Sequence, residues 1–436
     1  MAFTIPIRQD SGALIADRTP GLRQLAVVEV RTSEATQSFL VIGLSAILIF
    51  AVLAFGCTDP WAIATMEVGA ALLLLFWIWQ QITSGGLQLR ANPLFAPVAL
   101  FGLIIVVQIV FGLSAYVHAT REELWKYAAY GVLFLFASQC QRASAHRLLT
   151  ILAVFGFAVA LFALVQNLTY NGKIYWYSPS VGSSFGPYAN YSHYAGLMEM
   201  LTPIALAMAL ADGARRPQQL LWMVAGVVMA ATIFISSSRG GMIAFIVEMV
   251  FFAGLFVARR SSQTAWTLFA VCLLIGFLSL WIGDGRMLTK LDSLTEPLTN
   301  TNAATRLTIA RDSLRMVPDR PIAGWGLGLF PIVYPQYRSF PTDDLVNQAH
   351  NDYVQALVET GVLGFGCVVW FIVNLYRSGI QNLRARSKVA TARTLGPLVG
   401  CTGILVHSFS DFNLHIPANA ALFFVLCGIA SGRQNP

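Results

Sequence analysis

The sequence predicts an all-α integral membrane protein with about twelve transmembrane helices and one large external loop between the ninth and the tenth. The first observation behind this prediction is composition. The 436 residues are 56% hydrophobic and 11% charged, whereas an average soluble domain is about 25% charged. The second is that apolar runs of membrane-spanning length recur along the chain, and the third is that cations gather in alternate connections between them.

Each apolar run has about the 17 to 25 residues that a helix needs to cross the hydrocarbon core. The expected spans are 39–57, 61–80, 93–113, 123–140, 147–167, 193–212, 219–237, 241–258, 264–283, 353–375, 394–410 and 416–432. The expected regions are a cytoplasmic N-terminal segment (1–38), the first nine helices (39–283), an external loop (284–352), the last helices (353–432) and a cytoplasmic tail (433–436).

Orientation follows from the cations, because Lys and Arg in short connections stay on the cytoplasmic side. Such residues precede the first expected span and then occupy alternate connections, at Arg8, Arg18, Arg23, Arg31, Arg142, Arg147, Arg215, Arg216, Arg259, Arg260, Arg377, Arg384, Arg386, Lys388 and Arg393. Both termini are therefore expected in the cytoplasm. The net charge of +7 reflects these cations and the external loop, so no nucleic-acid partner is expected.

The external loop is cationic and closes on a histidine motif. It contains Arg286, Lys290, Arg306, Arg311, Arg315, Arg320 and Arg338 before His350-Asn351-Asp352. A surface helix is expected from an N-cap at Asn302 to Val317, with an apolar stripe formed by Ala303, Leu307, Ala310, Leu314 and Val317. Arg306 and Arg311 flank this stripe, where they either bind a lipid phosphate or snorkel along the membrane surface.

Arg239 lies in a short polar hinge, Ser236 to Gly241, between two expected spans. An ionisable residue at membrane depth is a functional candidate, and the guanidinium fork fits phosphate oxygens. The glycines that follow it permit close approach of backbone or ligand. We therefore expect Arg239 to bind a diphosphate from one side while Arg306 or Arg311 binds it from the other.

His350 is expected at the outer membrane surface, where a neutral imidazole near pH 7 can act as a general base; a structural histidine is the alternative. A second histidine, in His407-Ser408-Phe409-Ser410-Asp411, is compatible with a Ser/His/Asp hydrolase. No G-x-S-x-G motif accompanies it, which disfavours that interpretation. Gly324-Trp325-Gly326-Leu327-Gly328 resembles a nucleotide loop, but a tight turn is expected because no strand precedes it.

Metal-binding motifs are missing from the sequence, which has neither H-E-x-x-H nor an Asp-x-Asp of the kind that holds a metal against a nucleotide-sugar diphosphate. No metal and no cofactor are therefore expected. The charge of a leaving diphosphate is then expected to fall on arginines.

An ordered set of motifs resembles the superfamily of O-antigen ligases and O-antigen polymerases, and most of all the lipopolysaccharide O-antigen ligases. The set consists of Phe185-Gly186 through Asn190, Ser238-Arg239-Gly240-Gly241, the arginine helix, Gly324-Trp325-Gly326-Leu327-Gly328, and His350-Asn351-Asp352-Tyr353 through Glu359-Thr360-Gly361. The order of these motifs is more specific than any one of them.

The resemblance implies a membrane-embedded, GT-C-like glycosyltransferase of the bacterial inner membrane, inverting and metal-independent, with its active site facing the periplasm. The implied donor is a glycan on undecaprenyl diphosphate, and the implied acceptor is a sugar hydroxyl of lipid A core. The family's essential histidine falls on His350, and its donor-binding arginines fall on Arg239 and on Arg306 or Arg311. Arg121 and Lys126 are further candidate donor contacts.

Two alternatives remain at this point. Polymerases of O-antigen or exopolysaccharide belong to the same superfamily and share these motifs. A secondary transporter of lipid-linked or anionic solutes would also need about twelve helices and charges within the membrane. Glu67, Glu199 and Glu248 lie within expected spans and could serve that purpose.

Overall fold

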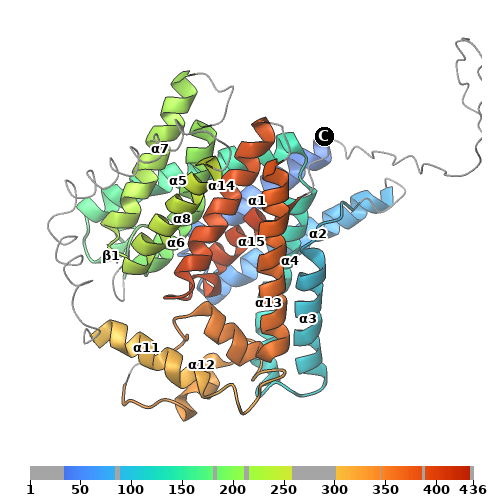
Figure 1. Ribbon diagram of the computed structural model, residues 1–436, viewed down its shortest axis with the longest axis vertical. Helices are drawn as coiled ribbons and strands as arrows, with labels where there is room; N and C mark the ends of the chain where they lie inside the picture. Colours follow the sequence, from blue (N-terminus) through green and yellow to red (C-terminus); the bar gives the residue numbers. More distant parts are fainter. Residues whose placement is uncertain are drawn as a thin grey trace, which may run out of the picture. The chain divides into compact units, whose positions relative to one another are not determined.

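The structure, a computed structural model, describes residues 34–83, 89–179, 184–210, 216–257, 301–343, 345–384 and 388–432. The described chain is mostly helical (Figure 1). Its helices are α1 (Glu34–Leu53), α2 (Pro60–Thr83), α3 (Phe95–Val110), α4 (Val117–Gln139), α5 (Arg142–Leu168), α6 (Tyr191–Ala209), α7 (Arg216–Ile235), α8 (Arg239–Val257), α11 (Thr301–Leu314), α12 (Phe330–Val333), α13 (Asp352–Arg384), α14 (Lys388–His407) and α15 (Pro417–Ser431). Two 3-10 turns, η1 (Tyr334–Gln336) and η2 (Asn413–His415), and a hairpin of β1 (Lys173–Ile174) and β2 (Ser178–Pro179) complete them.

Five of the described helices are long and apolar enough to cross a membrane, namely α1, α2, α5, α7 and α13. The chain is therefore an all-α membrane protein over its described residues. The expected span 264–283 lies outside those residues, whereas each of the other expected spans overlaps one helix among α1–α8 and α13–α15. The total of about twelve spans and the loop between the ninth and tenth stay predictions.

The centre of the described bundle is α6, whose residues from Ser192 to Ala209 are all buried. It packs against α7 and α14. Glycines of α14 permit the second contact, because a Cβ on Gly400 would lie 2.6 Å from the Met200 carbonyl oxygen and one on Gly396 2.8 Å from the Ile204 Cα. Close backbone approach at small residues is typical of helix pairs in membranes. This packing sets the polar residues of α6 beside those of α14.

The long helix α13 is kinked at Gly361, whose φ and ψ are 62° and −168°. A straight helix of its 33 residues would extend ~50 Å, well beyond a hydrocarbon core of ~30 Å. At the kink, the N–H groups of Val362 and Leu363 donate to the carbonyls of Pro321 and Ile322. The kink of α13 is thereby fastened to the segment that precedes this helix in the sequence.

The Gly324–Gly328 stretch forms a tight turn, as expected, with its glycines at φ values of 72°, 118° and 78°. The N–H of Gly328 lies 2.9 Å and that of Phe330 3.2 Å from the carboxylate oxygens of Glu359 on α13. The turn therefore uses its backbone donors to hold a carboxylate of its own chain. It does not form a nucleotide loop.

The expected apolar stripe of the arginine helix lies on the side that faces away from the rest of the protein. In α11, Leu307 and Leu314 are 59% and 49% exposed, and the buried face carries Ile309, Asp312 and Ser313. The Asp312 carboxylate accepts hydrogen bonds from the N–H and the hydroxyl of Ser339, which fixes the face that is buried. An exposed stripe is what a helix on the membrane surface requires, and its contact with the membrane stays a prediction. The helix also begins at Thr301 and ends at Leu314, so that Asn302 lies within its first turn.

Candidate active site

Asp411, in the connection between α14 and α15, has a fully buried side chain that faces three basic residues. His350 Nδ1 lies 3.7 Å and His193 Nε2 4.0 Å from its Oδ1, and Arg306 Nη1 lies 3.6 Å from its Oδ2. We call His193, Arg306, His350 and Asp411 the Asp411 cluster. It brings together side chains from α6, from α11, from the residue pair preceding α13, and from the connection after α14.

The charge of Asp411 is fixed by its neighbours. Burial opposes ionisation of its carboxyl group, but His350, Arg306 and His193 outweigh burial and hold the pKa of Asp411 well below its usual range. The carboxylate is therefore ionised at neutral and mildly acidic pH. A negative charge behind His350 stabilises the imidazolium that forms when this ring accepts a proton.

His350 is presented by an unusual backbone conformation. Its φ is 51°, in the left-handed region that few residues with a Cβ adopt. The side chain is 25% exposed, and its ring packs edge-on against Phe412 at a centroid distance of 5.0 Å. Such local strain is found preferentially at functional sites. One edge of the imidazole is thus supported while part of the ring stays accessible.

Asn351, the second residue of the His350-Asn351-Asp352 motif, forms hydrogen bonds through both the oxygen and the nitrogen of its amide. Its Oδ1 accepts hydrogen bonds from the N–H groups of Tyr353 and Val354, both at 3.0 Å, and so caps the start of α13. Its Nδ2 donates to the Phe409 carbonyl at 3.0 Å. One side chain therefore begins the helix and ties His350 to the connection that carries Asp411.

Asp352 strengthens the same tie through three hydrogen bonds to its carboxylate. Oδ2 accepts from the Ser408 hydroxyl at 2.7 Å and from the Leu414 N–H at 3.2 Å, and Oδ1 lies 2.6 Å from His415 Nδ1. Burial lowers the basicity of His415, but its hydrogen bond to Asp352 outweighs this and raises the pKa of His415 above its ordinary value. The His350-Asn351-Asp352 motif and residues 408–415 thus form one hydrogen-bonded unit.

Arg306 and Arg311 occupy different surroundings, although both flanked the expected stripe. Arg306 Nη1 donates to the Ser410 carbonyl at 2.8 Å in addition to facing Asp411, and its side chain is 38% exposed. Arg311 lies on the exposed face of α11, five residues further on. The structure therefore brings Arg306 and His350 together and leaves Arg311 outside the Asp411 cluster.

Arg239 is the first residue of α8 and is half-buried. The residue after it approaches the cluster closely, because a Cβ on Gly240 would lie 2.6 Å from the Ser410 hydroxyl oxygen. Since Arg306 binds the carbonyl of that same serine, the segments carrying Arg239 and Arg306 meet at Ser410. That the two arginines bind one diphosphate from two sides stays a prediction.

The other expected donor contacts have local partners at the start of α4. Arg121 Nη2 lies 2.9 Å from His118 Nδ1, and Lys126 pairs with Glu123. Neither pairing includes a member of the Asp411 cluster. A donor-binding role for these two cations stays a prediction.

The Ser/His/Asp hydrolase interpretation is not supported by the hydrogen bonds. His407 Nδ1 lies 2.9 Å from Glu199 Oε1 on α6, and the Ser408 hydroxyl donates to Asp352. Asp411 lies beyond the end of α14 and faces His350 instead.

His193 is the member of the Asp411 cluster that sequence reasoning did not single out. It lies in the first turn of α6, and the preceding Asn190 caps that helix through its bond to the Ser192 N–H. The available signal was its position, since His193, like His350, stands at the outer boundary of an expected span.

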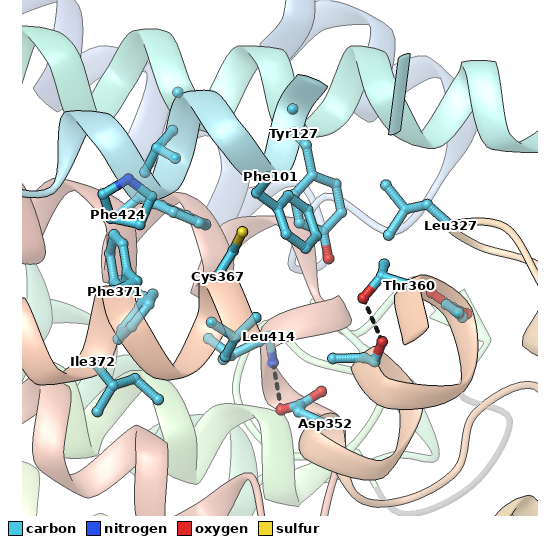
Figure 2. Close-up of a pocket in the computed structure, with 18 of the residues that line it drawn as sticks. Phe101, Tyr127, Leu327, Asp352, Thr360, Cys367, Phe371, Ile372, Leu414 and Phe424 are labelled. Atoms are coloured by element: carbon cyan, nitrogen blue, oxygen red, sulfur yellow. Dashed lines mark hydrogen bonds between the residues drawn. The ribbon is translucent and has the colours of Figure 1, made fainter. Parts of the chain in front are cut away.

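A cavity of about 350 Å³ lies next to the Asp352–His415 pair, between α3, α4, α13 and α15 (Figure 2). Its walls are mostly apolar and include Phe101, Tyr127, Leu327, Cys367, Phe371 and Phe424. The polar residues that line it are Asp352, Glu359, Thr360 and His415. An apolar space thus extends along α13 from the unit that holds His350.

Comparison with known protein families gives a match to part of the chain. Residues 224–369 match a family model described as O-antigen ligase, and this stretch contains Arg239, Arg306 and His350. A search of curated proteins found no match. This match covers about a third of the chain and supports the resemblance to the O-antigen ligase superfamily that the ordered motifs predicted.

Proposed function

We propose that this protein is an O-antigen ligase that transfers glycan from undecaprenyl diphosphate to a sugar hydroxyl of lipid A core at the periplasmic face of the inner membrane. The observation that carries the proposal is the Asp411 cluster, in which a half-exposed arginine and an accessible histidine share one buried carboxylate. A base and a cation side by side are what transfer from a diphosphate to a hydroxyl requires.

The chemistry follows from the orientation of His350. Its Nδ1 faces Asp411, which leaves Nε2 to accept the proton of the acceptor hydroxyl. The hydroxyl oxygen attacks the anomeric carbon of the donor as the bond from that carbon to the diphosphate oxygen breaks. The bonding electrons leave with the diphosphate, and attack from the opposite side inverts the anomeric centre.

The negative charge that develops on the diphosphate is assigned to the arginines. Arg306 is anchored through Nη1 to Ser410 and Asp411, so its remaining donors can bind phosphate oxygens from a fixed position. Arg239, from the segment that meets Ser410 on the other side, supplies the second guanidinium. Preorganised charge of this kind is the largest contribution to catalysis in many enzymes.

A lipid-linked donor also needs space for a hydrocarbon chain beside the site. The cavity along α13 is apolar and adjoins the Asp352–His415 pair, which supports a substrate that has a long apolar part. The roles of ligase and polymerase share this requirement. The two functions differ in the acceptor, and the acceptor is therefore what an experiment has to identify.

The test is deletion of the gene, followed by analysis of surface lipopolysaccharide and of undecaprenyl-linked glycan, and then restoration with the wild-type gene. A ligase is expected to leave bare core while long lipid-linked chains accumulate. Core capped by single units, with short lipid-linked species, would instead identify a polymerase. Unchanged pools would contradict both and favour transport or another acceptor.

A further inference from the structure

Behind the Asp411 cluster, a second pair of ionisable residues is buried between α6 and α14. His407 Nδ1 lies 2.9 Å from Oε1 and 3.2 Å from Oε2 of Glu199, and the two side chains are 1% and 0% exposed. Ionisable residues within a membrane protein are costly unless they are paired, and they are retained mainly where they serve the function. The catalytic scheme above does not use this pair.

The pair lies directly beneath the Arg239 turn. A Cβ on Gly240 would lie 2.9 Å from His407 Nε2, and a Cβ on Gly241 would lie 3.0 Å from Glu199 Oε1. Each of the two glycines after Arg239 therefore faces one member of the pair. The first turn of α8 rests on the pair at distances that a larger residue could not keep without a shift.

The orientation of His407 is determined at one nitrogen and open at the other. Glu199 holds Nδ1, whereas the buried Nε2 has no hydrogen-bond partner among the residues that the structure describes. A carboxylate that binds one nitrogen fixes both the direction and the tautomer of the ring. The free nitrogen is thereby aimed at Gly240.

We propose that Glu199 and His407 are positioning residues, which set the place of the Arg239 turn and so hold the Arg239 guanidinium ready for the donor diphosphate. This inference rests on the donor-binding role proposed for Arg239. Neither residue touches the reacting atoms. Their effect is expected on affinity for the lipid diphosphate.

Two matched pairs of variants separate positioning from general packing. Gly240→Ala places a methyl group against His407 and Ser410, whereas Gly254→Ala adds the same group to the same helix where nothing lies within 4 Å. Glu199→Leu removes the hydrogen bond to His407, whereas Glu199→Gln keeps an oxygen that can accept it. Glu248→Gln alters another fully buried carboxyl group and serves as a further control.

The measurement is the Kd of undecaprenyl diphosphate for the full chain in nanodiscs. Gly240→Ala and Glu199→Leu are expected to weaken binding by about tenfold, as for a misplaced guanidinium. Glu199→Gln, Gly254→Ala and Glu248→Gln should remain within about threefold of the wild type. Size-exclusion profiles and membrane levels identify any variant that fails to fold. The Kd values of the remaining variants then test the positioning role.

The outcomes distinguish failure of this inference from failure of the proposed function. If Arg239→Ala binds undecaprenyl diphosphate as tightly as the wild type, the donor-binding role of Arg239 is wrong. If Arg239→Ala loses binding but folded Gly240→Ala and Glu199→Leu retain it, the positioning role is wrong. Equal losses in Glu199→Leu and Glu199→Gln would also contradict it, because they would indicate a requirement for charge.

Discussion

Two histidine–carboxylate pairs, His350–Asp411 and His415–Asp352, are formed by neighbouring residues of the same two segments. They differ in the distance between the two side chains and in the other partners of the carboxylate. In the first, His350 Nδ1 is 3.7 Å from Asp411, and Arg306 competes for the same carboxylate. In the second, His415 Nδ1 is 2.6 Å from Asp352, whose other oxygen is also hydrogen-bonded. On the proposed function, the loose pair exchanges a proton with the substrate, whereas the tight pair joins two parts of the chain.

The sharpest test of this contrast is to remove each histidine. His350→Ala is expected to lower the transfer rate by at least about 100-fold at a normal membrane level, because a general base contributes 10²–10⁴. His415→Ala is expected to lower the protein level or thermal stability more than it lowers the rate per folded molecule. For both variants, the ligation rate per folded enzyme is measured together with the membrane level and the midpoint of thermal unfolding. A His350→Ala protein with wild-type turnover would exclude the general-base role.

The next largest effect is expected for Arg306, which lies beside the His350–Asp411 pair. Arg306→Ala is expected to reduce transfer by about 10- to 100-fold, because it removes a charge-assisted contact to the diphosphate and leaves Asp411 without its cation. Arg311→Ala, on the exposed face of the same helix, serves as the control and should stay within about twofold. Rates at saturating and at limiting donor provide the comparison. The reverse ranking would assign the donor to Arg311.

Asp352→Asn tests the structural role of the tight pair. The amide keeps the shape but cannot accept from Ser408, Leu414 and His415 as a carboxylate does. We expect a loss of about 1–3 kcal/mol in the free energy of unfolding, the usual consequence of a lost charge-assisted hydrogen bond. The midpoint of thermal unfolding in detergent measures it. An unchanged midpoint would mean that the unit is held by packing instead.

The smallest expected effect is on pH dependence. Because Asp352 raises the pKa of His415 above its ordinary value of 6.5, this pair stabilises the folded state fully below pH 6.5. The contribution is lost as the pH rises through the folded-state pKa. Thermal midpoints measured from pH 6 upward should therefore fall more for the wild type than for Asp352→Asn. Parallel curves for the two proteins would contradict this assignment.

Much of the fold was predictable, because membrane-spanning helices are specified by the length and apolarity of a run. The arginine helix shows where this reasoning ends. Periodicity predicted its apolar face, but it did not predict that Asp312 on the opposite face is buried by a bond to Ser339, a contact between residues distant in sequence. Periodicity alone does not contain such a contact.

The candidate site was predictable in its parts but not in its centre. Motif order pointed to Arg239, to Arg306 or Arg311, and to His350, and the structure places Arg306 and His350 at one carboxylate. Asp411 itself entered only through the disfavoured Ser/His/Asp interpretation, in which its spacing of four residues from His407 suggests a shared helical face. The helix ends at His407, so that Asp411 turns toward α13 instead. Helix ends are the least predictable feature of a sequence.

The hydrogen bonds that fasten His350-Asn351-Asp352 to residues 408–415 have a consequence for biosynthesis. The proposed base and its carboxylate reside on segments that leave the ribosome at different times, with the whole of α14 between them. A nascent chain that has inserted α13 but has not yet synthesised the residues after α14 therefore holds its histidine without a counter-ion and its first turn without an anchor. On the proposed function such a chain would be inert toward a lipid diphosphate, so completion of α14 and of the connection after it would be the step that switches the enzyme on.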